Sequence, residues 1–456
     1  MPQTTNPTLN YGKEQVVNSV NELITAAADP EIHTITVAQD LTGVPQIRLS
    51  PNKTLRGPRC RRSVLQFADG ADGICLTRDN LVDELDLVLS PERLAIRNDE
   101  SVSGLGTLTL RSVSTVGRVR LLARGAVRGG HVEIEGLDIV AADARGEQER
   151  PHEYGVYVLQ GAFTLWNMQS DPDVRITANL IGLSAGRPGS PVLGSGVFVG
   201  GASDTGGRLI VQHLETKAVY SDGRIEPGTA DQISGGVFVV FGTSVEVVLN
   251  NGPVSTYGAN DMALDNWGIV DRWISKDKVT TFGPSGVGFV NFGRIDELVT
   301  HAPIETFGVG ARGFNVYTGT IRSCDFDRIV THADGAVGVQ ISKPVGRLVF
   351  RRGIETHGTI GQSLVKGVLQ NLPATALSIK PGGSAQEIEV LGGLHSHGKD
   401  VLPFEQHGSI ESLRIEGGFS SATASSNKSL NRLAWMQRRS IAAPRISSLR
   451  GRGDSR

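Results

Sequence analysis

The chain repeats one five-residue motif with a constant 25-residue period: VSTYG at 254–258, VTTFG at 279–283, IETFG at 304–308, IVTHA at 329–333 and IETHG at 354–358. The third position is threonine in every copy, so the threonines are evenly spaced along the chain. Each copy starts with a β-branched residue and ends at glycine or alanine, as a short strand that enters a tight turn does. The sequence therefore has a structural period that the fold must share.

Two further β-type stretches complete each period. The first stretch combines a polar residue or valine with an aromatic residue and a glycine, and it occurs at 265–268, 290–293 and 315–319. The second stretch follows the first, as at 293–298. Fainter copies extend upstream to about residue 33 and downstream to about residue 420. Three short strands per period, without a helical period between them, predict strands that pair with their equivalents one turn later at about 4.8 Å. We therefore expect an all-β, single-stranded, right-handed parallel β-helix of roughly fifteen rungs.

The composition agrees with this fold. Glycine accounts for 57 of the 456 residues, which suits many rung corners, and aromatic residues for only 5%, which predicts a core of aliphatic stacks. The sequence has neither an apolar run of about 18 residues nor a pattern typical of a secretion signal. Three scattered cysteines fit buried thiols in a reducing compartment. We expect a cytoplasmic protein that does not contact a membrane.

Charge and helical patterning divide the chain into three parts. Residues 13–27 place apolar side chains on one helical stripe, so residues 1–32 are predicted to form a cap with an amphipathic helix. Residues 33–420 are the predicted β-helix. Residues 421–456 hold eight Lys and Arg against one Asp, so a +7 tail, predicted to be mostly disordered, follows a body of −9. An acidic body argues against nucleic-acid binding, and we interpret the GRGDS sequence at 451–455 as a chance occurrence.

Several of these features together carry a family resemblance. The cap, the run IRLSPNKTLRG at 47–57, the DGICL sequence at 72–76 and the 25-residue rungs resemble the pectin-lyase-like right-handed parallel β-helix superfamily. The resemblance implies the fold and a link to saccharide chemistry, because lyases, hydrolases, transferases, epimerases and phage tailspikes share this architecture. The polygalacturonase and lyase signature motifs do not match this chain, so no catalytic residue is carried over from the family.

The residues at the fourth position of the five motif copies are predicted to form a ladder of rings. Strand alternation points this position outward, beside the turn. The members of the ladder are Tyr257, Phe282, Phe307, His332 and His357. The row could present a stacking platform for sugars. Alternatively, the rings cover the turn by stacking on one another, or lie in the interface of a homo-oligomer, most simply a trimer.

A second outward column is predicted on the strands of the other motif. If Leu264 and Phe314 point inward, then Asp265, Asn315 and Gln340 point outward with aromatic neighbours. An exposed strip of this kind is typical of a groove that binds a saccharide. Arg312, on the same strand as Asn315, could hold a substrate carboxylate or phosphate, or pair with an aspartate of the next rung. The predicted substrate-binding residues are Trp267, Arg312, Asn315, Tyr317, Gln340, Lys343 and Lys366.

Candidate catalytic groups are carboxylates near these columns. Cleavage of a glycosidic bond needs two carboxyl groups about 5–9.5 Å apart. Asp265 is the leading candidate, with Asp261 and Asp271 on the same rung, although aspartates at turns often only bind backbone N–H groups. A second cluster could act as an acid pair, bind calcium, or consist of solvated turn acids. This cluster contains Asp325, Asp327 and His332.

No metal site is predicted. His395 and His397 share a strand face, but spacing identifies no third ligand, so the sequence predicts no cofactor apart from the calcium alternative. We expect a carbohydrate-active enzyme that cleaves or rearranges a glycosidic linkage by carboxylate acid–base catalysis. The alternatives are a non-catalytic oligomeric β-helix that binds glycans or is structural, and a lyase or isomerase acting on a uronic-acid-type sugar.

Overall fold

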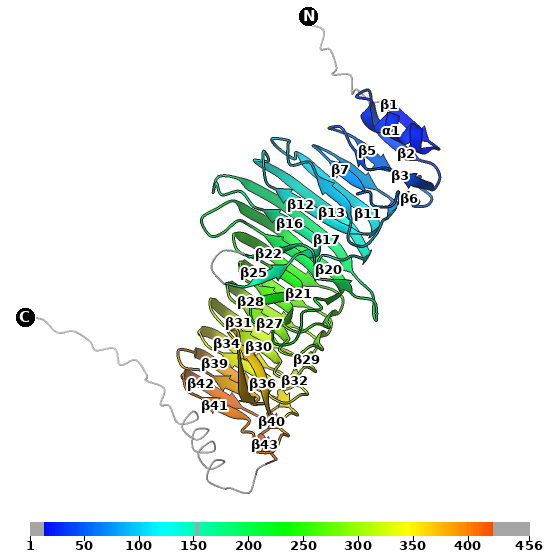
Figure 1. Cartoon of the computed structure of the whole chain (residues 1–456). Helices are drawn as coiled ribbons and strands as arrows, with labels where there is room; N and C mark the ends of the chain where they lie inside the picture. Colours follow the sequence, from blue (N-terminus) through cyan, green and yellow to red (C-terminus); the bar gives the residue numbers. More distant parts are fainter. Residues whose placement is uncertain (1–12, 151–154, 423–456) are drawn as a thin grey trace, which may run out of the picture.

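The computed structural model describes residues 13–150 and 155–422 as one elongated parallel β-helix (Figure 1). Each rung contributes one strand to sheet B and two strands to sheet A, as the three stretches per period predict. The strands of sheet A form two columns, which we call the long column and the short column. Along the chain, a strand of sheet B is followed by a strand of the long column and then by a strand of the short column. The strands of these columns pair in parallel with the equivalent strands one rung away, for example Asp265 with Val290 and Val290 with Asn315.

Sheet B is a single file of short strands. In order along the axis these are β4 (Ile47–Arg48), β7 (Ile74–Leu76), β10 (Leu94–Asn98), β12 (Arg118–Ala123), β16 (Gly161–Asn167), β19 (Ser195–Gly200), β21 (Gln232–Val239), β24 (Asp261–Asn266), β27 (Val287–Asn291), β30 (Arg312–Val316), β33 (Val337–Ile341), β38 (Leu377–Ile379) and β41 (Phe404–Gln406). Two strands lie beside this file: β14 (Gln148–Glu149) and β15 (Tyr157–Leu159), which pairs with β21.

Sheet A consists of the two other columns. The long column contains β1 (Lys13–Val17), β2 (Ile32–Val37), β5 (Thr54–Arg56), β8 (Leu81–Asp83), β22 (Thr243–Asn250), β25 (Ile269–Ser275), β28 (Arg294–Thr300), β31 (Thr320–Phe326), β34 (Pro344–Phe350), β39 (Ser384–Val390) and β42 (Ser409–Ile415). The short column contains β3 (Leu41–Val44), β6 (Ser63–Phe67), β9 (Leu85–Val88), β18 (Val192–Leu193), β23 (Val254–Thr256), β26 (Val279–Thr281), β29 (Ile304–Thr306), β32 (Ile329–Thr331), β35 (Ile354–Thr356), β40 (Leu394–Ser396) and β43 (Phe419–Ser421).

Four strands in the middle of the solenoid span both columns of sheet A. They are β11 (Thr107–Val116), β13 (Gly129–Ala141), β17 (Arg175–Ala185) and β20 (Arg208–Asp222). These strands bend between the columns, and Gly136 and Gly182 have φ of 85° and 74° at the bend. Glycine adopts this left-handed conformation without the clash that a Cβ would cause, so the chain turns there without breaking the ladder.

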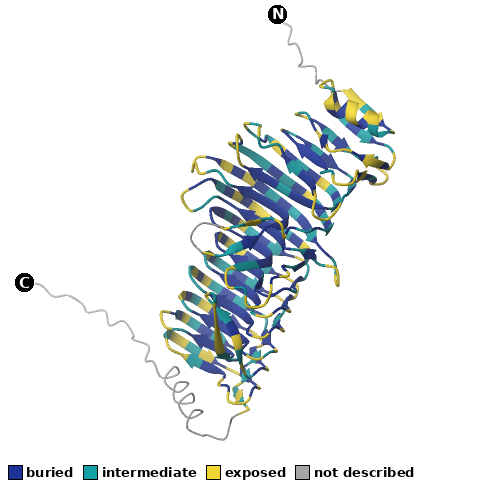
Figure 2. Cartoon of the chain, viewed as in Figure 1, coloured by how far each residue is buried: buried dark blue, intermediate teal, exposed yellow. Residues whose placement is uncertain are grey.

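The interior is filled by stacks of like residues. Figure 2 shows that buried segments recur on strand after strand along the solenoid. Leu264, Phe289, Phe314 and Val339 lie at equivalent positions of successive rungs and are fully buried, as strand alternation predicts. The core is less purely aliphatic than the composition indicates, because several of the few aromatic residues are stacked within it. The motif threonines pair with one another and are buried, so they point inward at the corner.

The helix of the N-terminal cap is shorter than predicted. Helix α1 (Val20–Ala28) begins at Ser19, whose hydroxyl accepts a hydrogen bond from the Glu22 amide, and it buries Leu23, Ala26 and Ala27 against the first rung. Residues 13–17 form strand β1 instead, because pairing with β2 satisfies their backbone groups. Of the described helices, none is long and apolar enough to cross a membrane. The predicted tail lies outside the described residues beyond position 422.

One hairpin interrupts the period. Thr356 pairs with Ser396, which follows after 40 residues and not after the usual period, and the additional chain forms β36 (Ile360–Val365) and β37 (Val368–Pro373). These two strands pair in antiparallel fashion, and β36 runs along the solenoid axis instead of across it (Figure 1). The turn places Lys366 and Gly367 at φ of 50° and 77°, the two left-handed positions of a tight two-residue hairpin turn.

Candidate functional site

The floor of the candidate site is the outer face of sheet B at β24, β27 and β30. Met262, Val287 and Arg312 occupy equivalent positions near the start of these three strands and pair with one another. All three side chains line a cavity. Simple alternation from the inward residues two positions later would point them into the core. The alternation is interrupted at the intervening residue, because Ala263 lies in the core together with Leu264.

A row of aromatic rings forms the other edge of this floor. Trp267, Phe292 and Tyr317 each follow a strand of sheet B by one residue. The rings of Trp267 and Phe292 are 5.7 Å apart in a T-shaped arrangement, and those of Phe292 and Tyr317 are 5.3 Å apart and nearly parallel. The stacking repeats along the axis because each ring lies one rung from the next.

The β36–β37 hairpin covers the floor. It folds back over the preceding rungs, since Thr359 donates to Asp334 at 2.6 Å, Ser363 to the Gly310 carbonyl at 2.7 Å, and the Leu364 amide to Ser285 at 3.0 Å. These three contacts reach one, two and three rungs back along the axis. The tip at Gly367 lies against Ala230, in the segment that precedes β21. The hairpin is therefore a roof over the outward side chains of sheet B.

Floor and roof enclose a cavity of about 560 Å³, which we call the covered cleft. Its walls are the residues of the two floor rows, the hairpin tip, and two segments that close the N-terminal side. Those segments contribute Gly155, Val156, Ala230, Asp231, Gln232 and Ile233. Asp231 is the single carboxylate among the described residues that line the covered cleft, so the walls carry more positive than negative charge.

Arg312 is the most unusual side chain of the covered cleft. It is 2% exposed, and neither its Nε nor its Nη2 group has a hydrogen-bond partner among the described residues. Burial lowers the pKa of its guanidinium, and Tyr317 offsets part of this effect. Three residues along the strand, the Nδ2 group of Asn315 is also buried without a partner. Both groups are hydrogen-bond donors, so this region of sheet B has buried donors without acceptors among the described residues.

A second cavity of about 430 Å³ adjoins the covered cleft and shares Tyr317 and Lys366 with it. Lys343, Lys380 and Gln340 also line this cavity. Lys380 is paired with Glu405 at 3.0 Å. Cationic and amide groups thus continue along sheet B past the hairpin tip.

The structure brings together most of the predicted substrate-binding residues. Six of the seven line one or both cavities, namely Trp267, Arg312, Tyr317, Gln340, Lys343 and Lys366. Asn315 points outward from the same floor and is buried, and it is not among the lining residues. The predicted column of Asp265, Asn315 and Gln340 lies on one outer face, but all three residues are buried, so the expectation that the strip is exposed is wrong. The hairpin inserted after β35 folds over these rungs.

Asp265 lies on this outer face, as predicted, but it does not line either cavity. The carboxyl is fully buried, and neither oxygen has a hydrogen-bond partner of ordinary geometry among the described residues. Burial raises its pKa well above the usual range, and the nearby Trp267 indole offsets only part of that effect. A buried carboxyl of this kind is held in its neutral form.

The other two aspartates of that rung are on different faces. Asp261 is buried at a corner, where its Oδ2 accepts hydrogen bonds from the amides of Gly258 at 2.7 Å and Gly223 at 3.3 Å. Asp271 is exposed on the long column of sheet A. The rung is a closed loop, so residues that are close in sequence end on opposite sides of it. The three aspartates therefore do not converge on one site.

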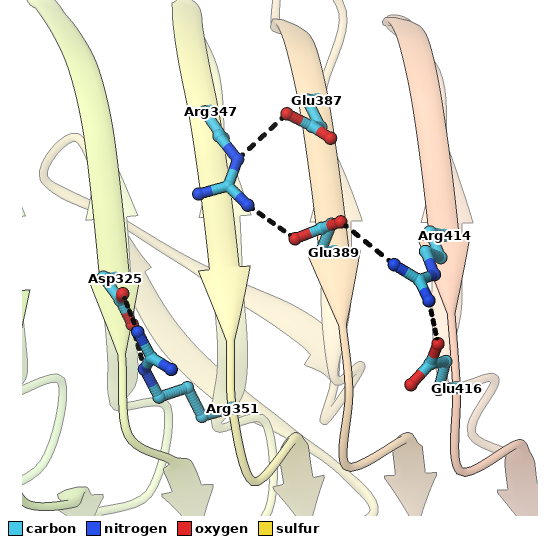
Figure 3. A network of polar contacts seen from close by, with 7 residues as sticks. All are labelled: Asp325, Arg347, Arg351, Glu387, Glu389, Arg414 and Glu416. Atoms are coloured by element: carbon cyan, nitrogen blue, oxygen red, sulfur yellow. Dashed lines mark hydrogen bonds and ion pairs between the residues drawn. The ribbon is translucent and has the colours of Figure 1, made fainter.

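Asp325 and Asp327 belong to a network of ion pairs on sheet A. Arg351 donates to Asp325 at 2.7 Å, and Arg352 donates to Asp327 at 2.7 Å. Figure 3 shows the first of these pairs beside a chain of contacts in which Arg347 bridges Glu387 and Glu389, and Arg414 bridges Glu389 and Glu416. Each aspartate is thus bound by its own arginine, and the two do not converge as an acid pair or as calcium ligands.

His332 lies in the predicted ladder of rings and not at the covered cleft. Its ring stacks on Phe307 at 4.4 Å and on His357 at 5.2 Å. The ladder runs from Tyr257 through Phe282 at separations of 5.1 and 5.2 Å, and it continues to His397, 4.7 Å from His357. The rings stack on one another beside the turns, which agrees with the interpretation that they cover these turns.

A larger depression, of about 710 Å³, lies over the long strands of sheet A. Its charged residues include Asp138 and Arg187, which are paired at 2.6 Å and partly exposed. Asp138 and Arg187 thus satisfy each other, whereas the covered cleft holds a buried guanidinium without a partner for two of its N–H groups among the described residues, so we place the candidate site in the covered cleft.

The sequence reasoning missed the roof and the closing segments. Ser285, Leu364 and Asp231 were not predicted as site residues, and neither was the hairpin as an element. The signal that could have revealed the hairpin is the break of the period after Thr356, where the next motif follows after 40 residues. Comparison of the chain with protein-family models, curated proteins and solved structures finds no match.

Proposed function

We propose that the protein acts on an acidic saccharide, which it binds in the covered cleft with a carboxylate of the sugar against Arg312. One observation carries this proposal: a fully buried guanidinium at the cavity wall has two N–H groups without partners among the described residues. Burying an unpaired charge is strongly unfavourable, by several kcal/mol. A ligand carboxylate would accept hydrogen bonds from both N–H groups in the bidentate geometry that arginine favours.

The remaining walls fit the body of a sugar. The rings of Trp267, Phe292 and Tyr317 offer apolar faces to pyranose C–H groups, and amide and amine groups stand at the hairpin side. Lys343 and Lys366 extend the positive charge into the adjoining cavity, which suits a saccharide with more than one acidic unit. Mostly apolar walls with a few polar groups are typical of small-molecule sites.

The lining favours elimination over hydrolysis as the reaction class. Hydrolysis needs two carboxyl groups about 5–9.5 Å apart, whereas Asp231 is the one carboxylate among the described lining residues. In elimination from a uronic acid, a base removes the proton beside the carboxylate, a C=C bond forms, and the bond to the leaving sugar oxygen breaks with protonation of that oxygen. Arg312 would neutralise the carboxylate, and Tyr317 and Lys366 are the groups that can carry the protons.

This proposal agrees with the pectin-lyase-like superfamily that the sequence resembles, and we propose that the chain belongs to it. A second candidate, an oligomeric β-helix, is favoured by a different observation. Phe282, Phe307 and Val309 are 43%, 40% and 45% exposed along one edge, which is a row that a partner subunit could cover. The carboxylate-based glycosidase that the sequence favours is less well supported, because none of its predicted aspartates reaches the cavity walls.

The test compares the wild-type protein with Arg312→Met on a panel of neutral and uronic-acid oligosaccharides. Methionine fills a similar volume without a charge, so the variant should fold at least as stably as the wild type. We expect the wild type to bind the acidic oligosaccharides, and Arg312→Met to weaken this binding roughly tenfold to hundredfold, the loss of a charge-assisted hydrogen-bond pair. An unsaturated product, detected by its ultraviolet absorbance, would establish elimination.

Arg351→Met is the matched control. Arg351 is exposed on sheet A and paired with Asp325, so its removal should leave saccharide binding unchanged. Binding of neutral and acidic oligosaccharides with equal affinity, or unchanged binding by Arg312→Met, would refute the proposed role of this arginine.

A further inference from the structure

Two histidines and a glutamate meet at the corner from which the hairpin departs. Glu355 lies in β35, His357 follows that strand, and His397 follows β40 on the next rung. The Oε1 atom of Glu355 is 3.1 Å from Nε2 of His357 and 2.9 Å from Nε2 of His397. The inserted hairpin separates the two histidines in sequence, yet their rings stack at 4.7 Å as neighbours in the ladder.

We propose that Glu355, His357 and His397 form a binding site for a divalent transition-metal ion of the Zn²⁺ class. Their donor atoms all lie within 4.8 Å of one another. Zinc bonds of about 2.0–2.1 Å at tetrahedral angles require donor atoms about 3.3 Å apart. The two nitrogen–oxygen distances are already close to that value, so only the two imidazoles must tilt toward each other.

The surroundings allow this tilt. The side chains of His357 and His397 are 39% and 48% exposed, so neither ring is locked by packing on its outer side. Glu355 is 18% exposed, and its other oxygen is held by Arg328. That ion pair fixes the carboxylate and leaves Oε1 directed at the imidazoles, as an outer-shell partner does at a metal site.

The donor set selects the class of ion. Imidazole nitrogen with one carboxylate oxygen suits Zn²⁺ and its neighbours Co²⁺, Ni²⁺ and Cu²⁺. Calcium and magnesium require six or more oxygen ligands, which these three residues do not provide. Three protein ligands leave a coordination position open toward solvent. Because His357 immediately precedes the loop into β36, the ion would clamp the rungs on either side of the inserted hairpin.

The ladder indicates which substitutions should preserve the fold. Phenylalanine occupies the position of His357 in two earlier rungs, at Phe282 and Phe307, where it stacks in the same way. His357→Phe and His397→Phe therefore remove a ligand and retain the ring stack. His332→Phe is the control, because His332 stacks in the same ladder but is not one of the three clustered donor residues.

The experiment titrates ZnCl₂ into the full-length protein, freed of metal with a chelator, by isothermal calorimetry. We expect one Zn²⁺ per chain, with affinity weakened roughly tenfold or more in His357→Phe and in His397→Phe and unchanged in His332→Phe. Co²⁺ should give the intense visible absorption of a tetrahedral site in the wild type and not in the two ligand variants. Absence of Zn²⁺ binding up to about 1 mM, or binding that both ligand variants retain unchanged, would overturn the proposal.

Discussion

Replacing Asp261 by asparagine should remove a loss of stability that the wild-type protein undergoes as the pH rises, and that originates at the corner beside β24. Asp261 is fully buried, and its Oδ2 accepts hydrogen bonds from the amides of Gly258 and Gly223. Burial is the main reason that its pKa is raised, and the nearby Asp222 carboxylate adds to it. Asparagine keeps an oxygen for the same two amides and carries no charge, so it should fit the corner at every pH.

The magnitude follows from the pKa of the folded state. The pKa of Asp261 is raised from 3.8 to about 7. Because the folded protein holds this proton more tightly than the unfolded chain, the stabilisation is fully present below about pH 3.8 and is lost as the pH rises through about 7. A rise of this size corresponds to a contribution of about 4 kcal/mol to the free energy of unfolding. Asp261→Asn should therefore match the wild type near pH 4 and exceed its stability by up to about 4 kcal/mol near pH 8.

The assay is urea unfolding of both proteins at a series of pH values, with hydrogen exchange at the amides of Gly258 and Gly223 as a local readout. Other titrating groups are common to both proteins and cancel in the difference between them. The difference should grow by about 1.4 kcal/mol per pH unit between about pH 4 and 7. A difference that does not change with pH would refute the reasoning, and so would a variant that is less stable at high pH. The variant should also bind saccharides normally, because Asp261 does not line the covered cleft.

Two further predictions concern the roof and the ladder. Replacing residues 359–374 with a short Gly–Ser link should leave the far-UV circular dichroism of the β-helix intact and abolish saccharide binding, since the hairpin forms a wall of the covered cleft; retained binding would contradict its role as a roof. Phe314→Ala should destabilise the protein by about 3–5 kcal/mol in thermal unfolding because it opens a cavity in the core, whereas Phe282→Ala should cost only about 0.5–1.5 kcal/mol because that ring is 43% exposed and loses mainly stacking. Equal losses for the two variants would contradict this assignment of core and surface.

The local pattern was a reliable guide to each rung. The spacing of the threonines, the inward set of Leu264 and Phe314, and the outward set of Asp265 and Asn315 all follow from strand alternation, and the structure has them in those places. The position of Tyr317 could be predicted for the same reason, because it is two residues after the outward Asn315. The outward position of Arg312 does not follow from alternation, because Arg312 is two residues before the inward Phe314.

The aspartates show where such reasoning stops. Asp325 appears in the sequence as a free carboxylate beside Asp327, but its partner, Arg351, lies 26 residues away on the next rung. Asp265 appears as an exposed group, yet it is fully buried. Ionisation and accessibility depend on neighbours in adjacent rungs and on the roof, and neither is visible in the spacing of one strand.

By itself, the sequence determined the period, the strands of the regular rungs and the direction of the side chains that follow simple alternation, because those features are encoded within a single repeat and every rung contacts mainly its two neighbours. Only the tertiary structure decided which outward side chains share a site. The hairpin at 360–373 folds back over three earlier rungs and buries Arg312 without a partner among the described residues. The same insertion lets His397 stack on His357 although the whole hairpin lies between them in the chain. Both outcomes depend on contacts between segments far apart in the chain, whose free energy no local pattern contains.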